Sequence, residues 1–187
     1  MDYQEGLNYL ENRDFEILSV TTDGRRGLTR IFQKYPYQVC QFHVQKGISI
    51  LLTKFPRTEA GKELQEINKN FIKDKLTEQE LGKKLAQYSQ KYSDFLSEKS
   101  ETDPTKFKHQ RLIKALRKYK NNMKYLFTYQ VGSKAKQYNP KEFKNTTNDL
   151  DGGLFSPLKQ LLNNHRGTTK LRRKKMIICY LNSRNLD

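Results

Sequence analysis

The sequence contains no tryptophan, only two cysteines and no long apolar run. A membrane-spanning helix needs roughly 18 consecutive apolar residues, and no segment approaches that length. Two cysteines are too few for the disulfide framework of a small secreted protein. The chain begins Met1-Asp2-Tyr3-Gln4-Glu5, which is acidic and polar, unlike a signal peptide. These absences exclude membrane and disulfide-rich classes, and we expect a reduced, cytoplasmic protein.

Two catalytic signatures are also missing. The sequence has no recognisable Ser/His/Asp arrangement and no glycine-rich phosphate loop, which argues against serine hydrolases and P-loop enzymes. With 187 residues, of which 35% are hydrophobic, the chain suits one domain, with or without an insertion.

Acidic residues are scarce in the C-terminal part, and this shortage accounts for the positive charge of the whole chain. Residues 105–187 hold 20 Lys/Arg against 4 Asp/Glu, whereas residues 1–60 hold 8 against 7 and residues 61–104 hold 8 against 9. The net charge of +16 attracts polyanions by long-range forces and counterion release. A lysine-rich solvated surface is the plainer interpretation, but a charge that served only solubility would have no reason to segregate. We therefore expect nucleic acid as a partner.

Residues 1–56 have the pattern of a small α/β unit. Residues 15–20 are rich in β-branched and apolar side chains and predict a strand, which Asp23-Gly24 ends with a turn. Residues 37–42 predict a second strand with Val39 facing inward, and Phe42 as a further inward candidate. Helices are expected over 3–12, around 28–32 and over 43–54. This alternation predicts two parallel strands with flanking helices.

Residues 57–131 predict a large all-α insertion. Apolar residues at steps of three and four predict three helices. The first covers 60–73, the second begins after the Thr77–Glu80 capping box, and the third ends at about residue 126. Residues 132–187 predict a loop over 132–147 and then basic helical segments over 156–164 and 169–182. The expected fold is therefore α/β and mostly helical, in three parts. The apolar positions of the insertion are Leu64, Ile67, Phe71, Leu81, Leu85, Tyr88, Tyr92, Phe95, Leu112, Leu116, Tyr119, Met123 and Leu126.

Two aspartates are candidate ligands for a divalent cation. Asp23 follows a predicted strand, and ligand sites in parallel sheets gather at the carboxyl ends of the strands. Asp149 and Asp151 lie within a strongly basic region, where cations could hold a phosphate substrate and carboxylates could hold Mg²⁺. The plainer alternatives are an ordinary Asp-Gly turn at Asp23 and helix capping by Asn148 or Asp149.

Cys40 and His43 form a C-x2-H pair. A structural zinc site needs four ligands, and the remaining candidates, His109, His165 and Cys179, show no recognisable spacing. We favour the alternative in which Cys40 is buried in the second strand and His43 caps it or hydrogen-bonds nearby.

Residues 161–175 predict the end of one helix, a turn at Gly167 and the start of a very basic helix that Thr168 or Thr169 caps. These cations could bind the phosphates of nucleic acid, and the plainer alternative is a solvated surface. The candidate contacts are Arg166, Lys170, Arg172, Arg173, Lys174 and Lys175.

Four segments follow one another in a distinctive order. A predicted strand ends in Val20-Thr21-Thr22-Asp23-Gly24; the next strand has the spacing P-x-x-x-C-x-x-H, from Pro36 to His43; a helical block follows; and the last part contains Thr146-Thr147-Asn148-Asp149-Leu150-Asp151-Gly152-Gly153 and then His165-Arg166-Gly167. In this order they resemble the Mutator-like group of bacterial insertion-sequence transposases, over roughly residues 15–180.

The resemblance implies a partial ribonuclease-H-like fold in which three carboxylates bind two Mg²⁺ ions. Such ions clamp the attacking and leaving oxygens of a phosphodiester, and relatives would cut and join DNA at element ends. The resemblance makes Asp23 the second acid and Asp151 the third. It also implies DNA as substrate, the nucleoid as location, and a second copy or a separate N-terminal half as partner.

Two departures from the family pattern bear on activity. The family usually has Glu at the third position, and the shorter Asp151 would misplace its carboxylate; a misplacement of about 1 Å can cost ~10²-fold in rate. About 14 residues precede the strand that leads to Asp23, and they look helical, so the first acid has no counterpart. We expect a truncated transposase fragment that is inactive alone. The alternatives are a non-catalytic basic nucleic-acid-binding protein and an interaction protein that uses the helical block.

Overall fold

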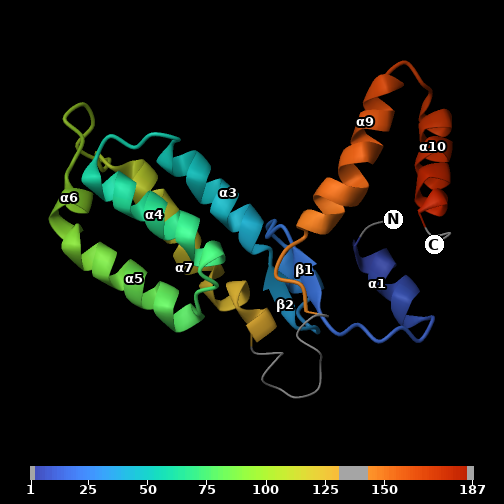
Figure 1. Ribbon diagram of the computed structural model, residues 1–187, viewed down its shortest axis with the longest axis horizontal. Coiled ribbons are helices and arrows are strands. Elements are labelled where there is room, and N and C mark those ends of the chain that lie inside the picture. The colour runs from blue at the N-terminus through green and yellow to red at the C-terminus, as the bar shows by residue number, and fades with distance from the viewer. Residues whose placement is uncertain (1–2, 131–142, 185–187) are drawn as a thin grey trace. The chain divides into compact units, whose positions relative to one another are not determined.

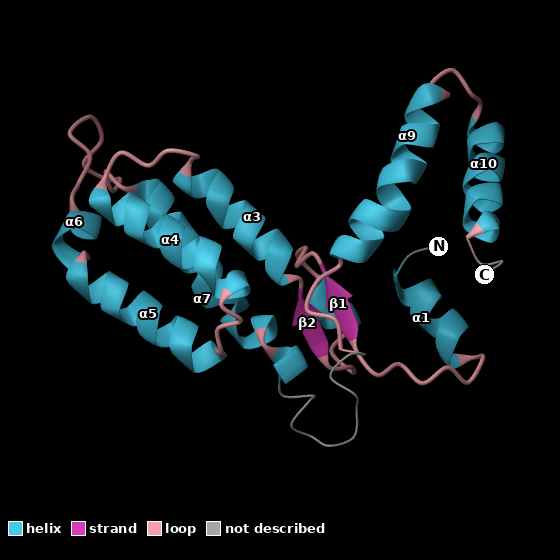
Figure 2. Cartoon of the chain, in the orientation of Figure 1, coloured by secondary structure: helices cyan, strands magenta, loops and turns pink. Residues whose placement is uncertain are grey.

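The computed structural model describes residues 3–130 and 143–184, which form two compact units divided between Thr146 and Thr147. Both units are mainly helical, and the strands of the described residues belong to the first (Figure 2). The first unit contains α1 (Tyr3–Glu11), β1 (Val20–Thr22), α2 (Leu28–Ile31), β2 (Tyr37–Val39), α3 (Gln41–Leu52), α4 (Glu59–Lys73), α5 (Glu78–Lys91), α6 (Ser93–Ser97) and α7 (Gln110–Leu126). The second contains η1 (Asp149–Phe155), α9 (Ser156–Asn164) and α10 (Lys170–Ser183).

The sheet of the first unit is a parallel pair, as the sequence predicts. Val20 pairs with Tyr37 and Thr22 with Val39, and α2 lies in the connection between the strands. Gly24 follows with a φ of +79°, and a Cβ there would lie 3.0 Å from Val39 Cγ1. The predicted Asp23-Gly24 turn is therefore confirmed, and it needs glycine both for its backbone conformation and for its packing.

Both strands are shorter than predicted. The first strand begins at Val20 and not at residue 15, because the paired edge starts where the Val20 amide donates to the Pro36 carbonyl, at 3.0 Å. The second strand ends at Val39 and not at residue 42, because Cys40 already turns the chain into α3 and its carbonyl accepts from Val44. The inward placement of Phe42 is wrong as well, since this side chain is 39% exposed on α3.

Four helices lie side by side: α3, which precedes the predicted insertion, and α4, α5 and α7, which belong to it (Figure 1). The expected apolar positions Leu64, Leu81 and Tyr119 are fully buried between them. One continuous core runs from these helices to Val39 and Leu28 beside the sheet. The α/β part and the helical block therefore fold around a shared core. The predicted boundary at 131/132 falls at the edge of the residues that the structure does not describe.

The starts of two bundle helices follow from local sequence. The Thr77 hydroxyl accepts from the Glu80 amide while the Glu80 carboxylate accepts from the Thr77 amide at 2.8 Å, so the predicted capping box is confirmed. Thr58 caps α4 by accepting from the Gly61 amide at 3.1 Å. Such caps satisfy backbone donors that the first turn leaves without helical partners.

Buried polar side chains join the sheet to the bundle. Gln38 and Gln41 are almost fully buried, and both side-chain amides donate to the Leu126 carbonyl at the end of α7, at 2.8 and 2.9 Å. The backbone amide of Tyr129 donates a hydrogen bond to the Gln38 side-chain oxygen at 3.1 Å. Because a C-terminal carbonyl of a helix lacks a helical donor, these two glutamines hold the end of α7 against β2 and α3.

The second unit consists of a helical segment and a hairpin-like pair of helices. Its first segment, η1, has π-helical winding and continues directly into α9 at Ser156, where Pro157 occupies the first turn. The predicted helices over 156–164 and 169–182 correspond to α9 and α10. The Tyr180 hydroxyl of α10 donates to the Leu154 carbonyl at 3.0 Å. The predicted loop over 132–147 lies mostly outside the described residues.

Candidate nucleic-acid interface

Asp23 lies directly after β1, at the carboxyl end of the parallel pair, where the sequence places it. Both of its oxygens contact Arg25: Oδ1 accepts from the Arg25 amide at 3.1 Å, and Oδ2 lies 2.9 Å from Arg25 Nε. The Asp23 side chain is one-third exposed. This is the geometry of an Asp-Gly turn reinforced by a local ion pair, the plainer of the two sequence interpretations.

The segment 143–146 runs along the same end of the sheet. The Thr21 hydroxyl donates to the Lys144 carbonyl at 2.7 Å, and the Gln41 amide donates to the Asn145 carbonyl at 3.0 Å. The Asn145 side chain also donates to the Gln41 side-chain oxygen, at 3.1 Å. Phe143 is buried. The chain that follows the helical block is thus hydrogen-bonded back to the sheet edge that carries Asp23.

Asp151 belongs to the second unit, within η1. The Thr147 hydroxyl donates to Asp151 Oδ2 at 3.0 Å, and the Asp151 amide donates to the Thr147 carbonyl at 3.0 Å. Gly152 and Gly153 are part of the same helical segment, and Pro157 fits because the first turn of α9 needs no backbone donor there.

The described carboxylates do not form the donor set of a two-metal site. Among residues 3–130 and 143–184, no group of three or more His, Cys, Asp or Glu side chains could hold a metal ion. Asp23 and Asp151 belong to different units, and each is held by its own local partners. The residues present therefore do not fit the Mg²⁺ ions that the family resemblance implies, and we derive no reaction step through them.

The expected alternative to a zinc site placed Cys40 in the buried second strand with His43 as a nearby cap or hydrogen-bonding partner. The structure agrees with this expectation only in part. Cys40 is fully buried, but it follows β2 as the N-cap residue of α3 and donates to Thr146 Oγ1 at 3.5 Å. His43 lies in the first turn of α3, with its ring 6.0 Å from that of Phe42. Cys40 makes no side-chain cap. The two residues mark the passage from strand to helix.

All six predicted phosphate contacts in the basic segment are exposed. Helix α9 ends at Asn164, and α10 begins at Lys170 with Thr169 as its N-cap, whose hydroxyl accepts from the Arg172 amide at 3.3 Å. Of the two capping candidates, Thr169 is therefore the one that caps. The exposed cations of this segment are Arg166, Lys170, Arg172, Arg173, Lys174 and Lys175.

A second basic surface, on α7, was missed by the sequence reasoning. This helix carries six cations and no acid over its 17 residues. Arg111, Lys114, Arg117, Lys120 and Lys124 are exposed, while Lys118 lies against Gly47 of α3. The signal in the sequence is a helical stretch without acids, whose cations are separated by apolar and polar residues and so form no contiguous run like that at 170–175.

The cations of α7 and α10 are not neutralised by the protein. Throughout the part of the chain that the structure describes, ion pairs involve Arg25, Lys34, Lys62, Lys91, Lys106, Lys108 and His109, and none involves a cation of α7 or α10. Arg111 donates to the Ile50 carbonyl at 2.8 Å, which leaves its charge uncompensated. Each helix therefore presents a row of cations to solvent.

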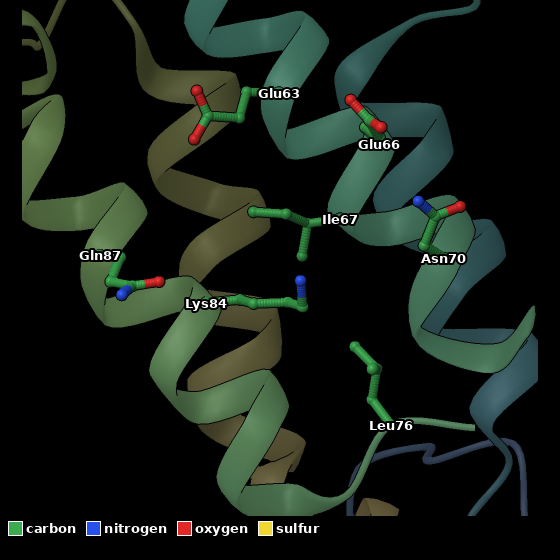
Figure 3. A pocket seen from close by; sticks show the side chains of 7 residues that line it. All are labelled: Glu63, Glu66, Ile67, Asn70, Leu76, Lys84 and Gln87. Carbon is green, nitrogen blue, oxygen red and sulfur yellow. The ribbon is translucent and has the colours of Figure 1, made fainter. Parts of the chain in front are cut away.

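A polar hollow of about 250 Å³ lies between α4 and α5 (Figure 3). Lys84 extends into it from α5, opposite Ile67 of α4. Glu63 at its margin is held by Lys91, 2.5 Å away, and by the Tyr92 hydroxyl at 2.9 Å. These hydrogen bonds keep the pKa of Glu63 below its ordinary value, and the bond from Lys91 has the largest effect. Glu63 thus works as an anion that ties α4 to α5.

Comparison with known proteins finds no matching family model, no matching curated protein and no matching solved structure. Among the described residues, no helix has both the length and the apolar character that crossing a membrane requires.

Proposed function

We propose that this chain binds nucleic acid, with DNA as the expected form, through the exposed cations of α7 and α10. The observation that carries the proposal is that these two helices contain no acid and that none of their cations is engaged in an ion pair within the described residues. Uncompensated rows of cations attract phosphates and gain free energy by releasing condensed counterions.

The distribution of charge favours a specific surface over a generally soluble one. Some cations outside α7 and α10 form ion pairs, such as Lys34, which follows α2, with Glu11, and Lys91 of α5 with Glu63. Lys170, Arg173 and Lys174 lie at positions i, i+3 and i+4 of α10 and so share one face of the helix, which lets them reach one phosphate backbone together. Phosphate contacts of this kind set affinity and register but carry no base specificity.

The test is the salt dependence of binding to a labelled DNA duplex, measured by fluorescence anisotropy. For B-DNA the slope of log K against log salt is about −0.9 for each phosphate that the protein neutralises. Replacing Arg172, Arg173, Lys174 and Lys175 by Gln should make this slope shallower by roughly one for each side chain that contacts a phosphate. The matched control removes four cations that the protein already pairs, Lys34, Lys62, Lys91 and Lys106.

We expect the control variant to keep the salt slope of the original protein. Equal weakening in both variants would mean that only the net charge matters, which contradicts the assigned surface. Thermal melts of both variants show whether either substitution disturbs the fold.

We propose further that the first unit is a partial ribonuclease-H-like core that does not cleave DNA by itself. The parallel pair, the acid at the carboxyl end of β1 and the helical block that follows β2 support this relationship. The engagement of both Asp23 oxygens by Arg25 argues against cleavage. Incubation of supercoiled plasmid with the purified chain and Mg²⁺ should give no nicking; nicking that Asp23→Asn abolishes would contradict this proposal, and Asp23→Asn should leave DNA affinity unchanged.

A further inference from the structure

An apolar groove of about 650 Å³ runs between α5 and α7. Gly82, Leu85 and Ala86 line it from α5, and Ile113, Leu116 and Met123 line it from α7. The sequence places Leu85, Leu116 and Met123 on helical stripes that should be buried, yet each is only partly covered. These apolar side chains pack against the edge of the core and also line the groove, which leaves part of each uncovered.

The α5 wall of the groove is built from small residues. Gly82, Ala86 and Ser89 follow one another at helical spacing along this wall. A Cβ added to Gly82 would meet no atom within 4 Å. Small residues at such spacing let the backbone of a second helix approach closely, so that its apolar side chains can reach the leucines below.

The α7 wall is positively charged. Arg117 and Lys120 line the groove, and neither forms an ion pair among the described residues. A second hollow, of about 220 Å³, shares Ile113 and Arg117 with the groove and adds the exposed Lys114, whereas its Lys106 is paired with Asp103. None of the residues that line either hollow is acidic. An occupant should therefore carry negative charge along the side that faces α7.

The dimensions of the groove fit a short helix. Ile113 and Met123 are ten residues apart on α7, which corresponds to about 15 Å, or roughly three helical turns. Apolar side chains at i, i+3, i+4 and i+7 of a docking helix would cover Leu85, Leu116 and Met123. An apolar floor rewards burial of apolar side chains, which a phosphate backbone cannot supply.

We propose that the α5–α7 groove is a docking site for an amphipathic helix of a partner protein that carries acidic residues along one flank. The leucines and methionine supply the buried contact, the small residues of α5 allow close approach, and Arg117 and Lys120 set the orientation by pairing with the acidic flank. Arg117 and Lys120 are among the α7 cations that the proposed function assigns to DNA, so the groove overlaps the α7 part of that surface, whereas the α10 cations do not line it.

The test uses a synthetic helical peptide of about four turns with leucines at i, i+3, i+4 and i+7 and glutamates along one flank. A twin peptide has every glutamate replaced by lysine. Binding of each to the full chain is followed by fluorescence anisotropy. The groove is blocked with Ala86→Trp, which fills it from an exposed position, and its charge is reversed with Arg117→Glu and Lys120→Glu together. Lys69→Glu with Lys62→Glu on α4 is the matched reversal outside the groove.

The glutamate peptide should bind, and the lysine twin should bind at least tenfold more weakly. Ala86→Trp and the groove charge reversal should each weaken binding by about tenfold or more, while the α4 reversal should not. Equal binding of the two peptides, or unchanged affinity in Ala86→Trp, overturns the proposal. Displacement of the peptide by DNA with no effect of Ala86→Trp would assign the surface to nucleic acid, and self-association that Ala86→Trp abolishes would assign it to a second copy; both outcomes overturn it. Loss of peptide binding with retained DNA binding in Ala86→Trp, which removes no cation, separates this test from that of the proposed function.

Discussion

Tyr119 and Asn68 are buried polar residues that satisfy each other's hydrogen-bonding groups inside the helical bundle. Both are fully buried, and the Tyr119 hydroxyl donates to the Asn68 side-chain oxygen at 2.7 Å. The Asn68 amide donates in turn to the Gln45 carbonyl and to Ser49 on α3. The network satisfies every hydrogen-bonding group of the Asn68 side chain and links α7, α4 and α3 at one point.

Tyr119→Phe should lower the free energy of unfolding by about 1–3 kcal/mol, because it leaves the buried Asn68 oxygen without a donor. Urea unfolding followed by circular dichroism measures the change. Tyr9→Phe, at a residue that is 47% exposed on α1, serves as the control and should be close to neutral. A neutral Tyr119→Phe would mean that water replaces the lost donor.

The same hydroxyl makes stability sensitive to alkaline pH. Burial raises the pKa of Tyr119 above its ordinary value. A raised pKa in the folded state contributes stability below the unfolded pKa of about 10 and loses it as pH rises further. The stability difference between the original protein and Tyr119→Phe should therefore shrink above about pH 10. Urea unfolding at several alkaline pH values tests this; a constant difference would show that the pKa of Tyr119 is the same in the folded and unfolded states.

At the scale of elements, α5 begins where its capping box places it. Thr77 and Glu80 exchange hydrogen bonds between side chains and backbone. The hydrogen bond from the Thr77 amide, and to a lesser extent the one from its hydroxyl, holds the pKa of Glu80 below the ordinary value. The helix then buries Leu81 and Tyr88. The cap fixes the start of the helix, and these apolar residues fix which face packs.

Thr77→Ala should destabilise the protein by about 1 kcal/mol, since the hydroxyl that accepts from the first turn is lost. Thr77→Ser keeps an acceptor at the same place and should retain most of the stability. Thermal or urea unfolding of the two variants gives the comparison. Equal losses in both would show that the methyl group of Thr77, and not its cap, stabilises α5.

Helix α7 has one face that packs in the core and another that carries cations. Leu112, Ala115, Tyr119 and Leu126 face the core, while five of its six cations face solvent. Like charges at helical spacing repel and weaken an isolated helix. Core packing and the two glutamines that bind the Leu126 carbonyl must offset this repulsion, and the surplus cations remain available to a polyanion.

For the whole molecule, the uneven charge predicts an unusual response to salt. The +16 charge is concentrated after residue 104, and self-repulsion of a charge that large opposes compact structure. Raising the salt concentration from about 50 to 200 mM should raise the melting temperature, because screening relieves this repulsion. Scanning calorimetry in NaCl measures it. A falling melting temperature would mean that the exposed ion pairs, such as Lys34 with Glu11, outweigh the repulsion.

Local patterns in the sequence determined much of this architecture. The parallel pair, the Asp23-Gly24 turn, the capping box at Thr77 and the boundaries of α4 and α9 follow from neighbouring residues, because turns, caps and helical stripes depend on interactions within a few positions. The charge excess that supports the proposed function is likewise a property of the sequence alone.

Only the tertiary structure decided where each strand ends and which apolar residues remain uncovered. The first strand could not begin before Val20 because its partner begins after Pro36, a restriction set by another segment. Leu116 and Met123 share the helical stripe of Tyr119, yet they line a groove because the small residues Gly82 and Ala86 of α5 face them. Burial depends on what lies opposite a side chain, and a sequence pattern specifies the face of a helix without specifying its neighbour.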